Sequence, residues 1–195
     1  MKYSLLGLAA TIFFISCGNG DAANTSNNEQ APVTVSSEEN YTPPAGVDAK
    51  VSASLKPVMD HYLDLKNALA ADKGKDASQA GEKLLSALNS VDTATMTAEQ
   101  KSSFNNVASD MREHAQHIAD NSDKIDHQRS HFKMLSDDTY DLAKTFGGGR
   151  KLFVAHCPMA LDGKGANWVS EFPEIRNPYF GDQMLECGEV KEELK

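Results

Sequence analysis

The stretch that decides the fold covers residues 97–146 and reads TAEQKSSFNNVASDMREHAQHIADNSDKIDHQRSHFKMLSDDTYDLAKTF. It opens with Thr97 and Gln100 at capping-box spacing, in which each side chain bonds the other residue's backbone N–H at a helix start. Apolar residues then recur every three or four positions on both sides of the polar residues 121–123, which supply a helix stop and a new N-cap. The stretch therefore predicts two antiparallel helices joined by a short loop.

Two further helices are predicted before this stretch, separated by a break at residues 73–75. Each carries apolar residues at the spacing of one helix face. The first stripe consists of Val51, Leu55, Val58, Tyr62, Leu65 and Leu69, and the second of Ala77, Ala80, Leu84, Leu88 and Val91. Because the glycines at 147–149 end the fourth helix, residues 49–149 are predicted to form an antiparallel, up-and-down four-helix bundle in a mainly α fold.

The pattern changes over residues 150–195. Two short extended segments, 152–155 and 167–170, flank a turn signal at 162–165 and predict a small β-hairpin. Prolines and glycines keep the rest irregular as far as residue 188. The tail is expected to fold back onto the bundle, because Trp168, Tyr179 and Phe180 are too many aromatic side chains to leave in water.

The charge balance excludes some classes of protein. Over 195 residues, 19 lysines and arginines stand against 28 aspartates and glutamates, a net charge of −9. Nucleic-acid binding draws on clustered basic residues, so this balance argues against it. The sequence also lacks a phosphate-binding loop, a nucleophile elbow and a zinc-protease helix, and we expect no enzyme.

The N-terminus is typical of an exported protein. Residues 1–16 join a short basic start to an apolar run too short to cross a membrane, which predicts a signal peptide. The residues Phe14 to Cys17 resemble a bacterial lipobox, which predicts lipidation of Cys17; an ordinary cleaved signal is the alternative. Residues 17–48 are polar and are predicted to be a flexible tether. Both interpretations place the protein outside the cytoplasm.

Histidines gather at the junction of the third and fourth helices. His114 and His117 are three residues apart, and His127 and His131 are four apart, so each pair shares a helix face. If the hairpin turns near Ser122, His117 faces His127 and His114 faces His131. Four imidazoles at one level are a ligand set that copper and zinc accept. The alternative is a row of polar histidines on an acidic surface.

A second group of candidate ligands contains sulfur. Cys157, Met159 and Cys187 offer thiolate and thioether donors, which select Cu(I) and, for the thiolates, also suit zinc. Two cysteines on neighbouring loops outside the cytoplasm also form disulfides readily, and Cys157–Cys187 would clasp the tail. Free thiols are the third possibility, and the sequence leaves all three open.

Five motifs can be singled out along the second half of the chain, at residues 125–136, 157–159, 163–168, 174–181 and 184–188. Together they resemble an uncharacterised helical domain of small Gram-negative lipoproteins, which is also appended to periplasmic adaptor subunits of copper and silver efflux pumps. The resemblance spans about residues 50–188. It implies binding of heavy-metal ions, chiefly copper, outside the inner membrane, in the stand-alone lipoprotein form.

Two functions therefore compete at the level of sequence. The first is a lipoprotein that binds copper or zinc and acts in metal buffering, transfer or efflux, anchored at Cys17 on the periplasmic side of the outer membrane, with efflux-pump components as partners. The second is a metal-free, membrane-tethered interaction module whose disulfide-clasped tail docks on a partner.

Overall fold

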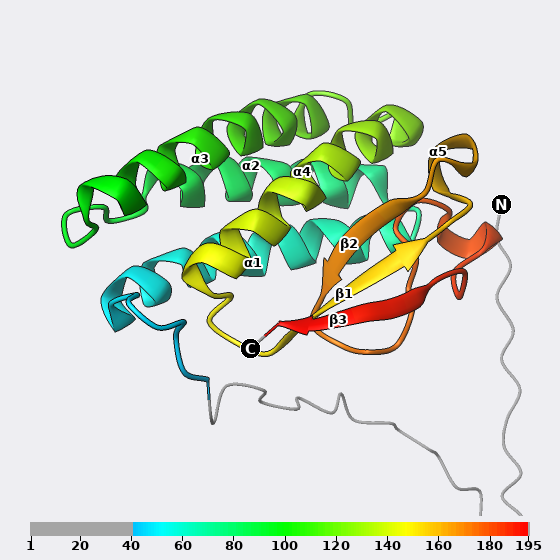
Figure 1. Cartoon of the computed structure of the whole chain (residues 1–195). Coiled ribbons are helices and arrows are strands. Elements are labelled where there is room, and N and C mark those ends of the chain that lie inside the picture. The colour runs from blue at the N-terminus through cyan, green and yellow to red at the C-terminus, as the bar shows by residue number, and fades with distance from the viewer. Residues whose placement is uncertain (1–40, 195) are drawn as a thin grey trace, which may run out of the picture. The chain divides into compact units, whose positions relative to one another are not determined.

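The computed structural model describes residues 41–194, so the predicted signal peptide, Cys17 and most of the predicted tether lie outside the described residues. Four helices come first in the chain, each packed against the next (Figure 1): α1 (Ala49–Ala70), α2 (Gly74–Asn89), α3 (Ala98–Ala119) and α4 (Ile125–Phe146). Helix α4 also contacts α1. The predicted mainly helical fold is confirmed.

Helix α3 begins as the sequence predicts, and α4 does not. The Thr97 hydroxyl accepts a hydrogen bond from the backbone N–H of Gln100 (3.2 Å), and the Gln100 carbonyl oxygen accepts one from the Thr97 N–H (3.0 Å). The N-cap of α4 is Lys124, whose side chain makes no capping hydrogen bond. The prediction of an N-cap within residues 121–123 is therefore wrong. Asn121 instead donates its side-chain amide to the carbonyl of His117 at the end of α3 (2.8 Å).

The tail forms a three-stranded antiparallel sheet in the order β2-β1-β3. The strands are β1 (Leu152–Cys157), β2 (Ala166–Ser170) and β3 (Glu189–Leu194), with a short turn α5 (Ala160–Gly163) and a 3-10 turn η1 (Gly181–Gln183) between them. The predicted hairpin is confirmed as β1–β2, with Val154 opposite Val169. Strand β3 was not predicted, because residues 189–194 are mostly charged, as suits an edge strand with little burial.

The sheet packs against α4 and α1 through aromatic side chains, which confirms that the tail folds back onto the helices. Trp168 and Tyr179 are 1% and 6% exposed. The Tyr179 ring lies 5.6 Å from that of Phe132 on α4. The hydroxyl of Tyr62 on α1 accepts a hydrogen bond from the backbone N–H of Val169 (3.0 Å). One hydrophobic core therefore joins helices and sheet.

The residues just before α1 also touch the helices. The side-chain amide of Gln100 donates a hydrogen bond to the carbonyl of Gly46 (3.1 Å). The Asp48 carboxylate caps α1 by accepting from the N–H of Lys50 (2.7 Å). Within residues 41–194, no helix combines the length and the apolar character needed to span a bilayer.

Candidate metal centre

The hairpin of α3 and α4 brings four histidines to one level. The ring centroids of His117 and His127 are 6.0 Å apart, and those of His114 and His131 are 5.5 Å apart. These are the two facing pairs predicted from the hairpin register. The register follows from local geometry, because the loop of residues 120–124 is too short to let one helix slide along the other.

His131 contacts each of the other three histidines. Its ring stacks on that of His117, with centroids 4.2 Å apart and planes 6° from parallel. The ring of His127 lies 4.6 Å away. The Nδ1 atom of His131 is 3.3 Å from Nδ1 of His114, a hydrogen bond in which one ring donates and the other accepts. His131 is therefore central to the cluster.

Three of the four histidines can hold one metal ion. The ligand atoms of His117, His127 and His131 all lie within 4.8 Å of one another. Across residues 41–194, no other group of three or more His, Cys, Asp or Glu side chains converges in this way. His114 lies outside the group, so the predicted site of four ligands becomes a site of three, with His114 bonded to one of them.

The three imidazoles fit a borderline metal ion. Nitrogens bound to a tetrahedral zinc ion at about 2.0–2.1 Å stand about 3.3 Å from one another, so the rings must draw together slightly. His117 and His127 are exposed, so packing leaves these two rings free to rotate toward the half-buried His131. Three nitrogen donors leave a fourth position for water or an exchanging ligand.

The surroundings of the cluster hold His131 in the neutral form that binds metals. Burial and, after it, repulsion from the neighbouring His117, His127 and His114 together lower its pKa to about 4. Burial also lowers the pKa of His114, against the opposing influence of the carboxylates of Glu113 and Asp110. The acidic neighbours supply a negative field that attracts cations.

In the metal-free protein, the imidazole of His131 is expected to titrate near pH 4, whereas an ordinary histidine titrates near about 6.5. Its pKa is lower in the folded than in the unfolded chain, so the neutral ring contributes stability above about pH 6.5 that is lost as the pH falls toward 4. NMR titration of the ring protons measures this. Removing the repulsion from His117 in His117→Ala should raise the midpoint of His131. A wild-type midpoint near 6.5 would contradict the prediction.

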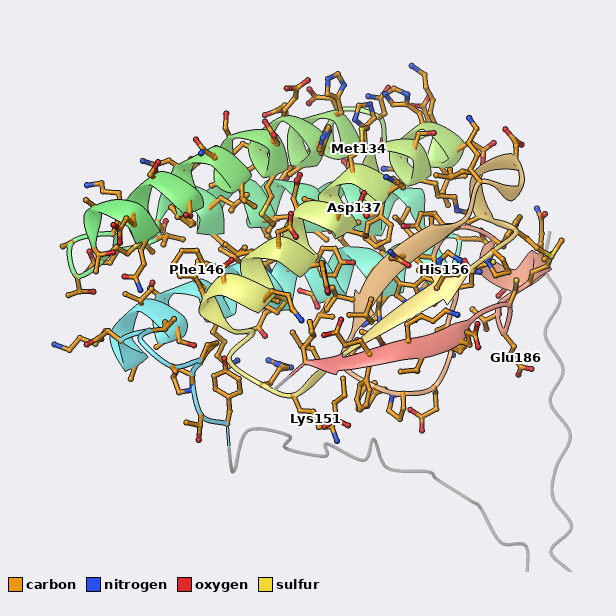
Figure 2. All side chains as sticks on the ribbon, in the orientation of Figure 1. Met134, Asp137, Phe146, Lys151, His156 and Glu186 are labelled. Carbon is orange, nitrogen blue, oxygen red and sulfur yellow. The ribbon has the colours of Figure 1, made fainter. Side chains whose placement is uncertain are left out.

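The carboxylate of Asp138 on α4 is a further feature that was not predicted from the sequence. One side-chain oxygen of Asp138 is buried without a hydrogen-bond partner. Burial and, after it, repulsion from carboxylates that include Asp110 and Asp141 together raise the pKa of Asp138 to about 6. Met134, which is labelled in Figure 2, is an exposed residue of the same helix. These carboxylates extend the negative field along α3 and α4.

The structure brings together two of the three predicted sulfur ligands. The Sγ atoms of Cys157 and Cys187 are 2.8 Å apart, as neighbouring thiols. Their hydrogen bond raises the pKa of the Cys187 thiol to about 11, so a metal must displace a firmly held proton. Met159 is 54% exposed. His156, labelled on β1 in Figure 2, bonds the side chain of Asn167 (2.8 Å).

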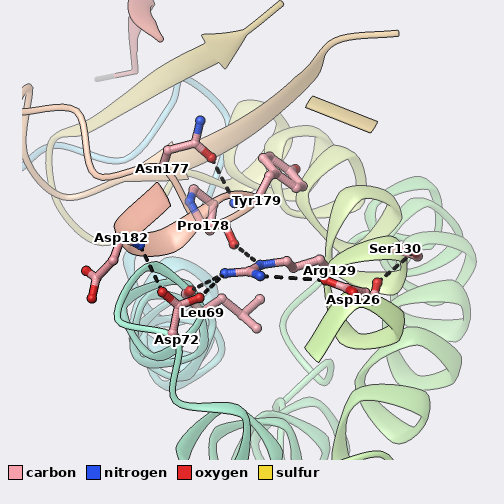
Figure 3. Close-up of polar contacts among 9 residues, drawn as sticks. All are labelled: Leu69, Asp72, Asp126, Arg129, Ser130, Asn177, Pro178, Tyr179 and Asp182. Atoms are coloured by element: carbon pink, nitrogen blue, oxygen red, sulfur yellow. Dashed lines mark hydrogen bonds and ion pairs between the residues drawn. The ribbon is translucent and has the colours of Figure 1, made fainter. Parts of the chain in front are cut away.

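Arg129, between two of the histidines in sequence, anchors α4 and was not predicted (Figure 3). Its side chain is 8% exposed. It donates to the carbonyls of Leu69 (3.2 Å) and Pro178 (2.9 Å) and to the carboxylate of Asp72 (2.6 Å), which also accepts from the N–H of Asp182 (2.9 Å). The one available signal was its place three residues before Phe132, on the apolar face of α4.

One family model matches most of the helical part of the chain. Residues 58–151 match the model of DUF3347, a family described as a protein of unknown function. The match contains all four clustered histidines and ends before Cys157. No curated protein and no solved structure matches the chain.

Proposed function

We propose that this chain, with its DUF3347 domain, is a metal-binding lipoprotein that holds copper or zinc at His117, His127 and His131 outside the cytoplasm. The observation that carries the proposal is the convergence of three imidazoles within 4.8 Å on two adjacent helices. Imidazole suits both Cu(II) and Zn(II), and Cu(II) binds more tightly to a given nitrogen site.

The exposure of the site favours an exchangeable ion over a structural one. His117 and His127 are exposed and His131 is half-buried, so ligands and water reach the metal directly. The hydrophobic core is built from apolar side chains of the four helices and the sheet. A site of this kind suits buffering the free ion, or transferring it to another protein or an efflux system.

His114 has a positioning role in this proposal. Metal-binding histidines are held by a hydrogen bond from their second ring nitrogen, and such partners affect affinity about 10- to 100-fold. Nδ1 of His131 is 3.3 Å from Nδ1 of His114, which leaves Nε2 of His131 for the metal. His114 therefore supports the three ligands without binding the ion.

The location of the protein is also a proposal. The lipobox-like sequence that ends at Cys17 supports a lipid anchor, and the polar residues after it support a tether. The anchor would keep the metal site on the periplasmic side of the outer membrane. The resemblance to a domain appended to copper and silver efflux adaptors supports efflux components as partners.

Calorimetry with Cu(II) and Zn(II) tests the site on the mature chain without a histidine tag. The wild type is expected to bind one ion with micromolar affinity or better. His127→Ala with His131→Ala should weaken binding by about 100-fold or more, beyond the range of a supporting residue, because two of three donors are lost. The matched control is His61→Ala, since His61 lies on α1 and pairs with Asp64 (3.3 Å).

A single change separates the supporting role of His114 from direct ligation. His114→Ala should retain the binding of one ion at about 10- to 100-fold lower affinity. If the double variant binds as the wild type does, the metal site lies elsewhere. If the wild type binds neither metal below millimolar concentrations, the interaction-module function takes its place.

A further inference from the structure

The two cysteines of the tail form a close and asymmetric pair. Their Sγ atoms are 2.8 Å apart, although 30 residues separate them in sequence. Cys157, at the end of β1, is fully buried, whereas Cys187, just before β3, is partly exposed. Cys187 is therefore the member of the pair that is open to solvent.

The sheet and a neighbouring asparagine hold the pair in place. Strands β1 and β3 pair antiparallel up to His156 opposite Glu189, next to the two cysteines. The side-chain amide of Asn177 donates a hydrogen bond to the carbonyl of Cys187 (2.7 Å). The N–H of Cys187 donates to the carbonyl of Met184 (3.0 Å). These contacts fix the backbone of Cys187 beside Cys157.

The geometry fits a covalent bond better than a shared metal ion. Two thiolates on one tetrahedral zinc ion, each about 2.3 Å from it, stand about 3.8 Å apart. The observed 2.8 Å is shorter. The S–S bond of a disulfide is about 2.05 Å long, so the two Sγ atoms need to approach each other by less than about 1 Å to form one. Within residues 41–194, no third His, Cys, Asp or Glu side chain joins the pair to complete a metal site.

We propose that Cys157 and Cys187 form a thiol–disulfide exchange site, in which Cys187 reacts first with an incoming disulfide and Cys157 completes the exchange. The co-reactant is an oxidised dithiol or small disulfide, R–S–S–R. The exposure of Cys187 makes it the entry point, and the burial of Cys157 restricts it to attack on its neighbour.

The exchange proceeds in two balanced steps. The Cys187 thiol, whose raised pKa keeps its thiolate scarce and this step slow at neutral pH, loses its proton and attacks one sulfur of R–S–S–R, so a Cys187–S–S–R bond forms and R–S⁻ leaves. The Cys157 thiol then loses its proton and attacks Sγ of Cys187, which forms the Cys157–Cys187 disulfide and releases the second R–S⁻. The two protons convert both leaving groups to thiols, so the protein is oxidised by two electrons and R–S–S–R is reduced.

The disulfide would close the loop that docks on the helices. The loop between the cysteines contains Pro178, whose carbonyl accepts from Arg129, and Asp182, whose N–H donates to Asp72 (Figure 3). Oxidation should therefore reinforce the attachment of the tail to α4 and to the turn after α1.

Reaction with oxidised glutathione, followed by intact-mass and peptide-mapping mass spectrometry, tests the proposal. The full chain with Cys17→Ser has only these two thiols. It should lose two hydrogens, keep no glutathione and melt at a higher temperature. Adding Cys157→Ser should trap one glutathionyl group on Cys187. Adding Cys187→Ser instead should leave Cys157 unmodified while folded and reactive after unfolding in denaturant.

Circular dichroism melts establish that each variant is folded before it is compared. Persistence of both thiols in the Cys17→Ser chain would overturn the exchange, and this result needs no change to either cysteine of the pair. Equal labelling of folded Cys157 and Cys187 in the two variants would overturn the order of reaction.

Discussion

Replacing Arg129 with methionine is expected to lower the free energy of unfolding by about 3 kcal/mol, since hydrogen bonds from a charged group contribute about 1.5–3 kcal/mol each. The guanidinium is 8% exposed and bonds the carbonyls of Leu69 and Pro178 as well as the carboxylate of Asp72. Methionine fills similar volume but donates no hydrogen bond. Both carbonyls then lose a donor, and the tail loses the hydrogen bond that joins Pro178 to α4.

Urea unfolding measures this effect, and Lys133→Met provides the matched control on the same helix. Lys133 pairs with Asp137 four residues later (2.5 Å), but the side chains are 36% and 45% exposed. Exposed pairs of this kind contribute about 0.3–0.5 kcal/mol. Equal losses in the two variants would show that the contacts of Arg129 stabilise the protein no more than a surface ion pair.

The second large effect is expected at the buried ion pair between α1 and the loop after β2. The Lys66 ammonium, on a residue 1% exposed, lies 2.5 Å from the Glu171 carboxylate. Glu171→Ala should cost about 3–5 kcal/mol, because removing one partner leaves an uncompensated buried charge. Burial already lowers the pKa of Lys66, so the lone amine would respond by losing its proton.

The double variant Lys66→Met with Glu171→Leu should recover most of the stability, because apolar replacement of a whole buried pair is often neutral or stabilising. Chemical unfolding of the single and double variants distinguishes the two cases. A double variant as unstable as Glu171→Ala would show that the loss comes from packing or from the bond between Asn67 and Glu171 (2.7 Å), and not from the isolated charge.

The same pair has a defined pH dependence. Burial alone raises the pKa of Glu171, but attraction to Lys66 and hydrogen bonds from Asn67 and Lys66 bring it below its ordinary value. A lowered carboxyl pKa means that its contribution is fully present above the unfolded pKa and is lost as the pH falls through the folded pKa. The pair therefore stabilises the protein at neutral pH and weakens in acid.

Features that depend on neighbours within one or two helical turns could be predicted from the sequence. The capping box of Thr97 and Gln100 was one. The facing of His117 with His127 was another, because helical spacing and a short loop leave the hairpin only one register. The start of α4 at Lys124 was missed, since Asn121 bonds back to α3 instead of capping the next helix.

The separate role of His114 depended on side-chain conformation. Its backbone position matches the prediction, yet its ring bonds His131 and does not join the three convergent imidazoles. Sequence spacing places an imidazole on a helix face, but the direction of its nitrogens is decided by rotamers and by the rings around it. Three of the four predicted ligands therefore remain candidate ligands, and His114 instead forms a hydrogen bond with one of them.

By itself, the sequence determined the four helices, the β1–β2 hairpin and the level at which the histidines meet, because each follows from periodicity and short connections. Only the tertiary structure decided that β3 pairs with β1, that the sulfurs of Cys157 and Cys187 meet, and that Lys66 is buried against Glu171. The partners in these contacts lie 30 to 105 residues apart. Such contacts depend on how the helices and sheet share one core, which no local spacing encodes.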